Sequence, residues 1–495
     1  MRLDLVIYIL GWILIVYSAA MIPSLAMAWW FGTGGGAPLT ISILLTAAVG
    51  IAAIFARGKQ QEADITPREG FLIVAGSWFL CSLFGALHFF IADTFADPNA
   101  SQSLYTVFLS FSNSVFESTS GLTTTGASVL TDFHQPHAIL FWRSTTHWLG
   151  GMGIIVLSLA ILPLIGAGGM QLFKAEMPGP IADRLKPRIT DTALTLSKVY
   201  VLVTAVQTIA LMACGMNLYE ALCHTFGTVA TGGFSTHPSS IGGYENSAVN
   251  WITIVFMTIA GVNFSLHYRF LMGDFSCYRK SGEFRTYILL LAGASFIITL
   301  WVFPSGQEGG LFRSFEHAVF QVVSIMTTTG YCTANYEEWP RLAGMMLFFL
   351  MFIGGCAGST GGGMKVIRII LLSKIAYREM MRLLYPTSII VIKQDGEAVN
   401  DKILYGITGF FILVGAVFIS SCLLLSAYDL DFITSLTATA ACLFNIGPGL
   451  GAVGPYDNYA AMPLLIKWWL ALCMIAGRLE LYSVFILTAP RFWTR

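Results

Sequence analysis

The sequence predicts an all-α integral membrane protein, in which four pseudo-symmetric helix–pore-loop–helix repeats surround one pore and an extra N-terminal helix hairpin lies outside them. The first observation is composition: the 495 residues are 56% hydrophobic and 11% charged, and their mean hydropathy is +0.71. A water-soluble domain carries about 25% charged residues. The second observation is that apolar runs of about 20 residues, the length that crosses a bilayer, recur along the chain. The third is a short Thr/Gly-rich stretch that returns four times between these runs.

Ten apolar segments are expected to cross the membrane, because each is close to or above the length that a spanning helix needs. The first has no A-x-A-like cleavage site behind it and is therefore interpreted as a retained helix. The ten segments are 3–31, 39–57, 69–93, 138–166, 192–215, 247–275, 284–304, 342–382, 402–427 and 462–489. The first two form the N-terminal hairpin, within residues 1–60.

Four shorter or weaker apolar segments each precede one Thr/Gly-rich stretch and do not qualify as spans. This order predicts a re-entrant pore helix followed by an extended loop in every repeat. The four pore segments are 104–122, 218–229, 312–326 and 430–443. The expected repeats are 66–170, 188–280, 283–385 and 400–495.

Positive charge indicates the orientation, because lysine and arginine mark the cytoplasmic side of a membrane protein. Of the 27 Lys and Arg residues, 22 fall on the side opposite the Thr/Gly-rich stretches. Both termini are therefore expected in the cytoplasm, and the stretches are expected to face outward. The five exceptions are Arg143, Arg313, Arg341, Lys467 and Arg478. Arg143 and Lys467 lie near outer helix ends, where a long side chain can snorkel to the membrane surface.

The Thr/Gly-rich stretches are spaced like four related units. Their marker glycines, Gly126, Gly233, Gly330 and Gly447, are 107, 97 and 117 residues apart. Glycine permits backbone angles that turn carbonyl groups toward an axis, and threonine adds a hydroxyl oxygen. Four such loops at membrane depth are what a cation selectivity filter needs, and an oxygen-only ligand set suits a hard monovalent cation. The predicted cation-binding residues are Thr124, Thr125, Gly126, Thr231, Gly232, Gly233, Thr328, Thr329, Gly330, Asn445, Ile446 and Gly447.

The register of these loops is open in two repeats. In the second, residues 233–236 match 330–333, but a shift by one to Gly232 is also compatible with the sequence. The fourth is the least similar, because Pro448 follows its marker glycine. A different interpretation of all four glycines is that they only cap short helices.

Acidic residues accompany the pore segments. Four of them sit at the starts of these segments, where a carboxylate complements a helix N-terminus; they are Glu220, Glu316, Asp429 and Asp431. Glu117 is different, because it lies inside the first pore segment. It is expected to brace the filter by accepting hydrogen bonds from nearby backbone or hydroxyl groups.

A glycine-rich stretch predicts a broken helix in the third repeat. Six of the ten residues 354–363 are glycine, and each costs about 1 kcal/mol of helix propensity relative to alanine. The break falls just below the filter, where a flexible loop can occlude a pore. An alternative is close helix packing through the pair Gly354 and Gly358. The predicted gate residues are Gly354, Gly355, Gly358, Ser359, Thr360, Gly361, Gly362, Gly363 and Arg478.

Arg478 is assigned to the gate because it lies in the middle of an apolar segment. A charge there costs at least ~2.5–3.5 kcal/mol on insertion scales, so it is expected to face protein or water. Its expected role is an electrostatic barrier below the filter, held by carbonyl groups of the glycine-rich stretch. The alternative is a structural pair with Glu480, which residues two apart on a helix do not favour.

This pattern resembles the Trk/Ktr/HKT superfamily of cation transporters over essentially the full chain, and within it the membrane subunits of bacterial Trk potassium uptake. The residues that carry the resemblance are 123–126, 231–233, 327–330, 445–447, 354–363 and Arg478. The resemblance implies potassium as the transported ion and a homodimer with one pore per protomer. It also implies a cytoplasmic nucleotide-binding regulatory subunit of the RCK type, and a location in the lipid of a bacterial inner membrane.

Partners and cofactors are constrained by missing motifs. The chain has no G-x-G-x-x-G unit and no Walker motif, so nucleotide control is expected from another subunit, for which the basic stretches 174–188 and 365–402 are candidate docking sites. No cofactor beside the transported K⁺ is expected. A formal net charge of zero gives no indication of nucleic-acid binding. The nine cysteines form no C-x-x-C pair and are expected to pack as small apolar residues.

Two other functional classes compete with a gated pore. A potassium symporter coupled to protons or sodium stays open, because broken helices and internal repeats are also features of transporters. An intramembrane hydrolase built on Ser359 is disfavoured, because Ala357 stands where G-x-S-x-G requires glycine. A purely structural scaffold has no use for four filter loops, and the chain is not expected to be an enzyme.

Overall fold

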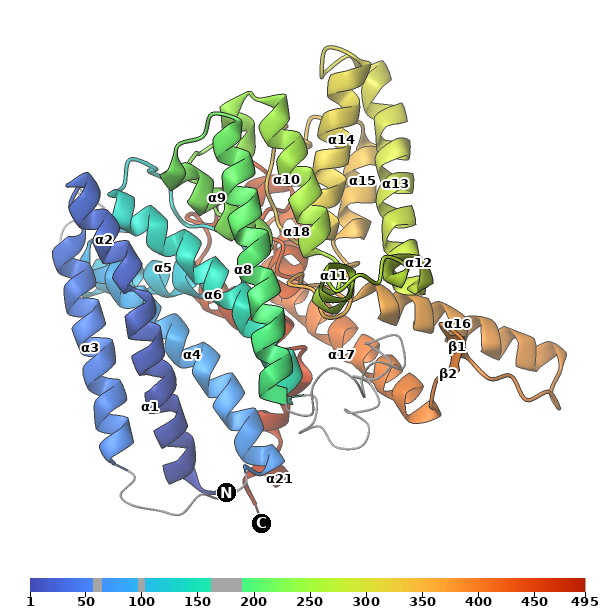
Figure 1. Ribbon diagram of the computed structural model, residues 1–495, viewed down its shortest axis with the longest axis horizontal. Coiled ribbons are helices and arrows are strands. Elements are labelled where there is room, and N and C mark those ends of the chain that lie inside the picture. Colours follow the sequence, from blue (N-terminus) through green and yellow to red (C-terminus); the bar gives the residue numbers. More distant parts are fainter. Residues whose placement is uncertain (57–64, 97–102, 162–188, 495) are drawn as a thin grey trace.

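The computed structural model describes residues 1–56, 65–96, 103–161 and 189–494, and these are mostly helical with almost no strand, as the sequence predicts. The basic stretch 174–188 lies outside the described residues. The N-terminal hairpin consists of α1 (Leu3–Ala20), α2 (Ile22–Phe31) and α3 (Gly36–Phe55). These helices pack along one edge of the molecule, and the two chain termini lie close together at one end (Figure 1).

The remaining helices fall into four groups, each of which contains one short helix that precedes a Thr/Gly-rich stretch. The first group is α4 (Pro67–Ile91), α5 (Leu104–Leu122) and α6 (His137–Ile161); the second is α8 (Ile189–Ala213), α9 (Leu218–Val229), α10 (Ser247–Ala260), α11 (Phe264–Leu271) and α12 (Cys277–Lys280). The third is α13 (Gly282–Val302), α14 (Leu311–Met326), α15 (Arg341–Leu350) and α16 (Val366–Leu384). The fourth is α17 (Asp401–Ser426), α18 (Phe432–Leu443), α19 (Leu464–Arg478), α20 (Tyr482–Phe485) and α21 (Pro490–Trp493). Strands β1 (Lys393–Gln394) and β2 (Glu397–Ala398) form a small antiparallel hairpin before α17.

Several of the ten expected spans are not continuous helices. Six described helices are long and apolar enough to cross a membrane, and the number rises to eight when each bent pair counts as one span. Segment 247–275 bends by 99° between α10 and α11, and segment 462–489 bends by 112° after α19. Segment 342–382 divides into α15 and α16, and α16 projects away from the body of the molecule (Figure 1).

The short helices begin where side chains cap their first turn. Ser103, Asn217 and Asp431 each accept a hydrogen bond from a backbone N–H three residues later, at the starts of α5, α9 and α18. Such a cap satisfies one of the unpaired N–H groups of a helix N-terminus. Glu316 is a correction to the expectation of a helix-start role, because it lies beyond the first turn of α14 and accepts hydrogen bonds from Ser247 and Asn250 of α10 instead.

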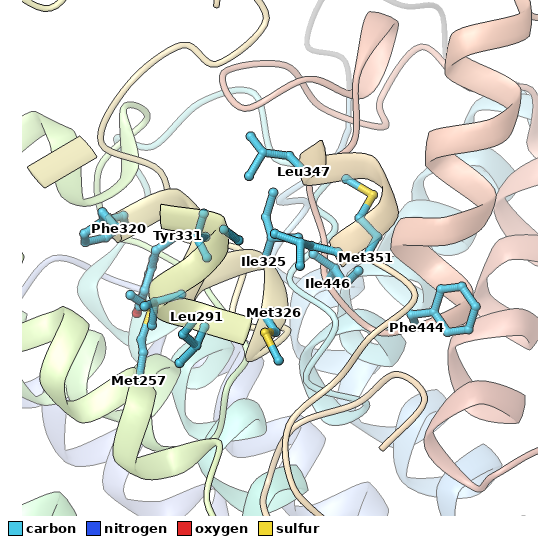
Figure 2. Packing of buried hydrophobic residues seen from close by; sticks show 14 of the residues in the cluster. Met257, Leu291, Phe320, Ile325, Met326, Tyr331, Leu347, Met351, Phe444 and Ile446 are labelled. Atoms are coloured by element: carbon cyan, nitrogen blue, oxygen red, sulfur yellow. The ribbon is translucent and has the colours of Figure 1, made fainter. Parts of the chain in front are cut away.

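The largest buried apolar cluster lies where the second, third and fourth groups of helices meet (Figure 2). It joins Met257 of α10 and Leu291 of α13 to Ile325 of α14, and it reaches Phe444 and Ile446 after α18. Apolar side chains elsewhere are exposed, including Trp30 (85%) and Leu104 (92%). Large apolar side chains on the outer surface suit contact with lipid chains.

Candidate functional site

The four pore helices, α5, α9, α14 and α18, end in the same backbone turn. Just past each helix, one residue adopts the left-handed conformation that β-branched side chains rarely take. These residues are Thr124, Thr231, Thr328 and Asn445, with φ of 52°, 57°, 59° and 56°. The glycine two residues later also has positive φ: 82° at Gly126, 80° at Gly233, 80° at Gly330 and 100° at Gly447. This pair of angles makes Gly233, rather than Gly232, the structural equivalent of the other three.

The left-handed residue closes each pore helix through a Schellman-type cap, in which a later N–H returns to a carbonyl five residues earlier. The four bonds are Thr125 N to Ser120 O (2.9 Å), Gly232 N to Gly227 O (2.7 Å), Thr329 N to Ser324 O (2.8 Å) and Ile446 N to Ala441 O (2.8 Å). The left-handed cap residue is therefore threonine or asparagine, and the N–H groups of Gly233, Gly330 and Gly447 add longer bonds of 3.4, 3.3 and 3.4 Å to the same helix carbonyl groups. The interpretation in which these glycines only cap helices is wrong. A left-handed threonine costs about 1–2 kcal/mol, a strain that clusters at functional sites.

The marker glycines bring the four loops into one closed ring. A β-carbon on any of them would collide with a backbone carbonyl oxygen of the adjoining loop. The pairs are Gly126 with Gly232, Gly233 with Thr329, Gly330 with Ile446, and Gly447 with Thr125. The order of repeats around the ring is thus first, second, third, fourth and back to the first. All four marker glycines also line a single pocket, whose wall includes the carboxylate residue Asp457.

Eight backbone carbonyl groups of this ring accept no hydrogen bond from any described part of the chain, whereas those of Gly447 and Gly330 accept one from the Tyr459 hydroxyl and the Cys332 thiol. The residues concerned are Thr124, Thr125, Thr231, Gly232, Thr328, Thr329, Asn445 and Ile446. All of them are buried, and a buried carbonyl group normally has a hydrogen-bond donor. The ring therefore presents a set of free oxygen acceptors, the ligand type that a hard monovalent cation prefers.

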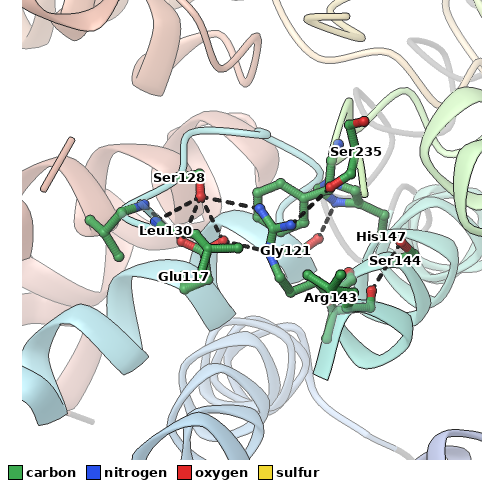
Figure 3. Close-up of polar contacts among 12 residues, drawn as sticks. Glu117, Gly121, Ser128, Leu130, Arg143, Ser144, His147 and Ser235 are labelled. Atoms are coloured by element: carbon green, nitrogen blue, oxygen red, sulfur yellow. Dashed lines mark hydrogen bonds and ion pairs between the residues drawn. The ribbon is translucent and has the colours of Figure 1, made fainter. Parts of the chain in front are cut away.

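A buried ion pair connects the first loop to the second (Figure 3). Arg143 Nε donates to Glu117 Oε1 at 2.7 Å, and the two side chains are 2% and 0% exposed. Glu117 also accepts hydrogen bonds from the Ser128 hydroxyl and the Val129 N–H, both at 2.9 Å, so the expected bracing contacts are present. Arg143 donates further to the Ser235 carbonyl at 3.1 Å. The expectation that Arg143 snorkels is wrong, because an acid of the pore helix holds it inside.

His147 forms a second bridge between the same two loops (Figure 3). Its Nε2 accepts a hydrogen bond from the Phe234 N–H at 3.1 Å, so in the neutral ring Nδ1 carries the proton and donates to the Gly121 carbonyl at 2.7 Å. Sequence reasoning did not identify this role. A histidine inside an apolar helix is a weak signal, and its partners are far away along the chain.

Lys467 is a second correction to the expected snorkelling. The residue is 1% exposed, and its Nζ donates to Asn113 Oδ1 at 2.8 Å and to the Ala460 carbonyl at 2.7 Å. Asn113 belongs to α5, so this contact joins the fourth group of helices to the first. A polar residue on the pore helix was the available signal, but its partner lies 354 positions away.

The glycine-rich stretch 354–363 is a loop between α15 and α16, so the alternative of close packing between helices does not apply. It lies against the ends of three pore helices. Thr360 Oγ1 donates to the Val229 carbonyl of α9 at 2.9 Å, and the Gly362 N–H donates to the Thr328 hydroxyl at 2.6 Å. A β-carbon on Gly362 would lie 2.5 Å from the Phe444 carbonyl oxygen. The loop is also bound by the carboxylate of Glu283, which accepts the Ala357 N–H at 2.8 Å.

Arg478 is the last residue of α19 and lies beside this loop. Its side chain is 3% exposed, and it donates to the carbonyl groups of Thr360 at 2.7 Å and Gly150 at 3.4 Å. The expected contact with a carbonyl group of the glycine-rich loop is therefore present. Glu480 is paired with Arg368 at 2.5 Å, so the alternative of a pair between Arg478 and Glu480 is wrong.

The sequence matches the model of the TrkH family, described as a cation transport protein, over residues 37–495. It is 40% identical over 488 residues to the Trk system potassium uptake protein TrkH of Escherichia coli K12, with 98% of each chain covered. It is 39% identical over 500 residues to the protein of the same name from Halomonas elongata, with 100% of each covered. The fold is similar to the crystal structure of the potassium transporter TrkH from Vibrio parahaemolyticus, with a TM-score of 0.89, 36% identity and 100% coverage of both chains.

Proposed function

Because this chain belongs to the TrkH family of cation transport proteins, we propose that it takes up potassium ions through the ring of four loops at the ends of its pore helices. The observation that carries this proposal is the closed ring of four loops, eight of whose buried carbonyl groups accept no hydrogen bond from a described residue. The chain is a multi-pass membrane protein, and a non-helical backbone at membrane depth is tolerated only where protein buries it or where it lines a cavity. A shared ion path satisfies that condition for all four loops.

Potassium selection in this proposal depends on the carbonyl oxygens of the four loops. An ion that enters from the pocket beside Asp457 exchanges its water shell for carbonyl oxygens contributed by all four repeats. The adjoining loops fix one another through the glycine contacts, so the ring does not need to reorganise around each ion. All four loops open onto the same pocket and therefore contribute to one shared ion path. This arrangement supports a pore over the alternative of a symporter coupled to protons or sodium.

The glycine-rich loop and Arg478 act in this proposal as the gate. The loop lies against the ends of three pore helices, where it obstructs the path beyond the ring. Arg478 places a positive charge beside the loop and is tied to it through the Thr360 carbonyl. Opening requires the loop to leave these hydrogen bonds, which glycine-rich backbone does readily.

Control of this gate is assigned to a separate cytoplasmic nucleotide-binding subunit, in keeping with the Trk systems to which the relatives belong by name. We place both termini in the cytoplasm of a bacterium, the chain in the inner membrane, and two copies in a homodimer. The projecting helix α16 and the basic stretch 365–402 are the proposed docking surface for the regulatory subunit. Pull-down of the purified subunit by wild-type protein, and its loss when the exposed Arg382 of α16 is neutralised, tests this assignment.

Cation flux through the purified protein in liposomes tests the proposed function. With no other ion gradient, we expect passage of potassium and rubidium in preference to sodium, and a reversal potential set by potassium alone. Flux that requires a proton or sodium gradient would instead establish the symporter. Absence of any cation flux from a folded, correctly inserted protein would contradict uptake through this ring.

The Arg478→Ala variant is expected to pass potassium about tenfold faster than the wild type, the effect of lowering the barrier by ~1.4 kcal/mol. The reason is that the substitution removes both a fixed positive charge and the hydrogen bond that holds Thr360 in the loop. Arg491→Ala, an exposed arginine of α21, is the matched control and should leave flux unchanged. A folded Arg478→Ala protein with wild-type flux would remove the barrier from the mechanism.

A further inference from the structure

The four left-handed residues of the ring use their side chains differently, although their backbones match. The Thr124 hydroxyl has no partner among the described residues. The Thr231 hydroxyl donates to the adjacent Ala230 carbonyl at 2.6 Å. The Asn445 amide donates to the Thr125 hydroxyl at 2.9 Å, within the ring itself. Of these four side chains, only that of Thr328 accepts a hydrogen bond from the described residues of the glycine-rich loop, through the Gly362 N–H at 2.6 Å.

The loop is shaped to reach this hydroxyl. Glycines at 361, 362 and 363 allow its backbone to approach the third and fourth pore helices directly. A β-carbon on Gly361 would lie 3.1 Å from the Thr327 carbonyl oxygen, and one on Gly362 would lie 2.5 Å from that of Phe444. The Gly362 N–H is buried, and a buried N–H without an acceptor is costly. Displacement of the loop therefore has to break the bond to Thr328.

We propose that the Thr328 hydroxyl is the latch that couples the glycine-rich loop to the filter. The inference rests on the proposed function and adds to it the residue that carries the contact. With the loop in place, the Thr328 oxygen is committed to the Gly362 N–H. With the loop displaced, that oxygen is released and loses its partner, which is the state in which the Thr124 oxygen already lies. Thr328 is thus a positioning residue for the gate, and among the described residues of the ring it is the one whose side chain is hydrogen-bonded to the glycine-rich loop.

The position of the loop is measurable without ion flux, because Cys356 lies in it. The Cys356 thiol is 1% exposed, so a displaced loop exposes it to a membrane-permeant maleimide. The experiment uses the full-length protein in liposomes and quantifies the modified Cys356 peptide by mass spectrometry. Potassium flux is measured on the same preparations.

Thr328→Val keeps the branched shape and removes the hydroxyl. We expect Cys356 modification to speed up about two- to tenfold, the range for loss of one neutral hydrogen bond, while Thr328→Ser retains the wild-type rate. Thr124→Val is the matched control, since it removes the equivalent hydroxyl from a residue that does not hold the loop; its Cys356 rate should equal that of the wild type. Thr328→Ala removes the same hydroxyl with fewer atoms and replaces the valine variant should that variant fail to fold.

The Cys356 modification rates test the role of Thr328, and the potassium flux of the wild type tests the proposed function. Equal Cys356 rates in wild type, Thr328→Val and Thr328→Ala would overturn the latch, and so would an equal acceleration in Thr124→Val. Either can occur while the wild type still conducts potassium. If the wild type conducts no potassium, the proposed function fails, and the Cys356 rates still report whether Thr328 holds the loop.

Discussion

Replacement of Glu117 by glutamine is expected to destabilise the protein and to weaken its preference for potassium over sodium. Glu117 is the carboxylate partner of Arg143, and both side chains are buried. Removal of one partner from a buried ion pair leaves an uncompensated charge, at a cost of about 3–5 kcal/mol. The same carboxylate accepts the Val129 N–H next to the first loop, and Arg143 holds the Ser235 carbonyl next to the second. The junction of the two loops therefore loosens, and we expect a lower thermal midpoint in detergent and a reversal potential shifted toward that of sodium.

Two further variants identify the cause. Glu69→Gln removes another buried carboxylate from an ion pair, with Arg2 at 2.9 Å, but this pair lies at the start of α4, away from the ring. It should lower the thermal midpoint and leave selectivity intact. Glu117→Gln combined with Arg143→Met removes both charges and should recover much of the stability, since a neutral pair leaves no buried charge. Wild-type stability and selectivity in Glu117→Gln would show that the pair does not hold the loops.

Gly330→Ala is expected to reduce potassium flux by at least tenfold. Gly330 has a φ of 80°, which alanine adopts at a cost of about 1–2 kcal/mol. The added β-carbon would also collide with the Ile446 carbonyl oxygen and approach Pro448 Cδ at 2.8 Å. That carbonyl belongs to the fourth loop, so the substitution displaces an oxygen of the ring as well as the backbone of its own loop. Potassium flux in liposomes at equal protein content measures the effect.

Gly293→Ala is the control for this substitution, because a β-carbon there meets no atom within 4 Å. It lies inside α13, where alanine favours helix by about 1 kcal/mol over glycine, so flux should be unchanged and stability slightly raised. Wild-type flux in a folded Gly330→Ala protein would contradict a rigid ring at this junction.

The pore helices were predictable from the sequence within two residues at each end, because they are short apolar segments and are followed by a recurring motif. The second, for example, was expected at 218–229 and is α9, Leu218–Val229. The non-helical stretch 354–363 was predictable for a similar local reason, its glycine content. The oxygen-bearing residues of the loops could likewise be named in advance; their binding of potassium remains a prediction.

Contacts between repeats could not be predicted, because their signal is not local. Arg143 and Lys467 lie near helix ends, which favours snorkelling, yet Glu117 and Asn113 of α5 hold them inside. The break after α19 was also unexpected, since residues 479–481 contain neither glycine nor proline. Glu480 and Leu481 adopt positive φ there, held by the pairing of Glu480 with Arg368, a residue of another repeat.

One polypeptide supplies all four loops of the ring, so the four left-handed positions are separate residues of the same chain. A channel assembled from four identical subunits changes all four loops with every substitution, so the effect of a single altered loop is inaccessible. Here Thr124, Thr231, Thr328 and Asn445 can be exchanged one at a time, in pairs or all together. Conductance can then be compared between variants that have the same number of altered loops in different positions. The difference between such variants measures how far the ring departs from fourfold equivalence. Because the hydrogen bonds of the side chain differ at all four positions, we expect this difference in conductance to be large.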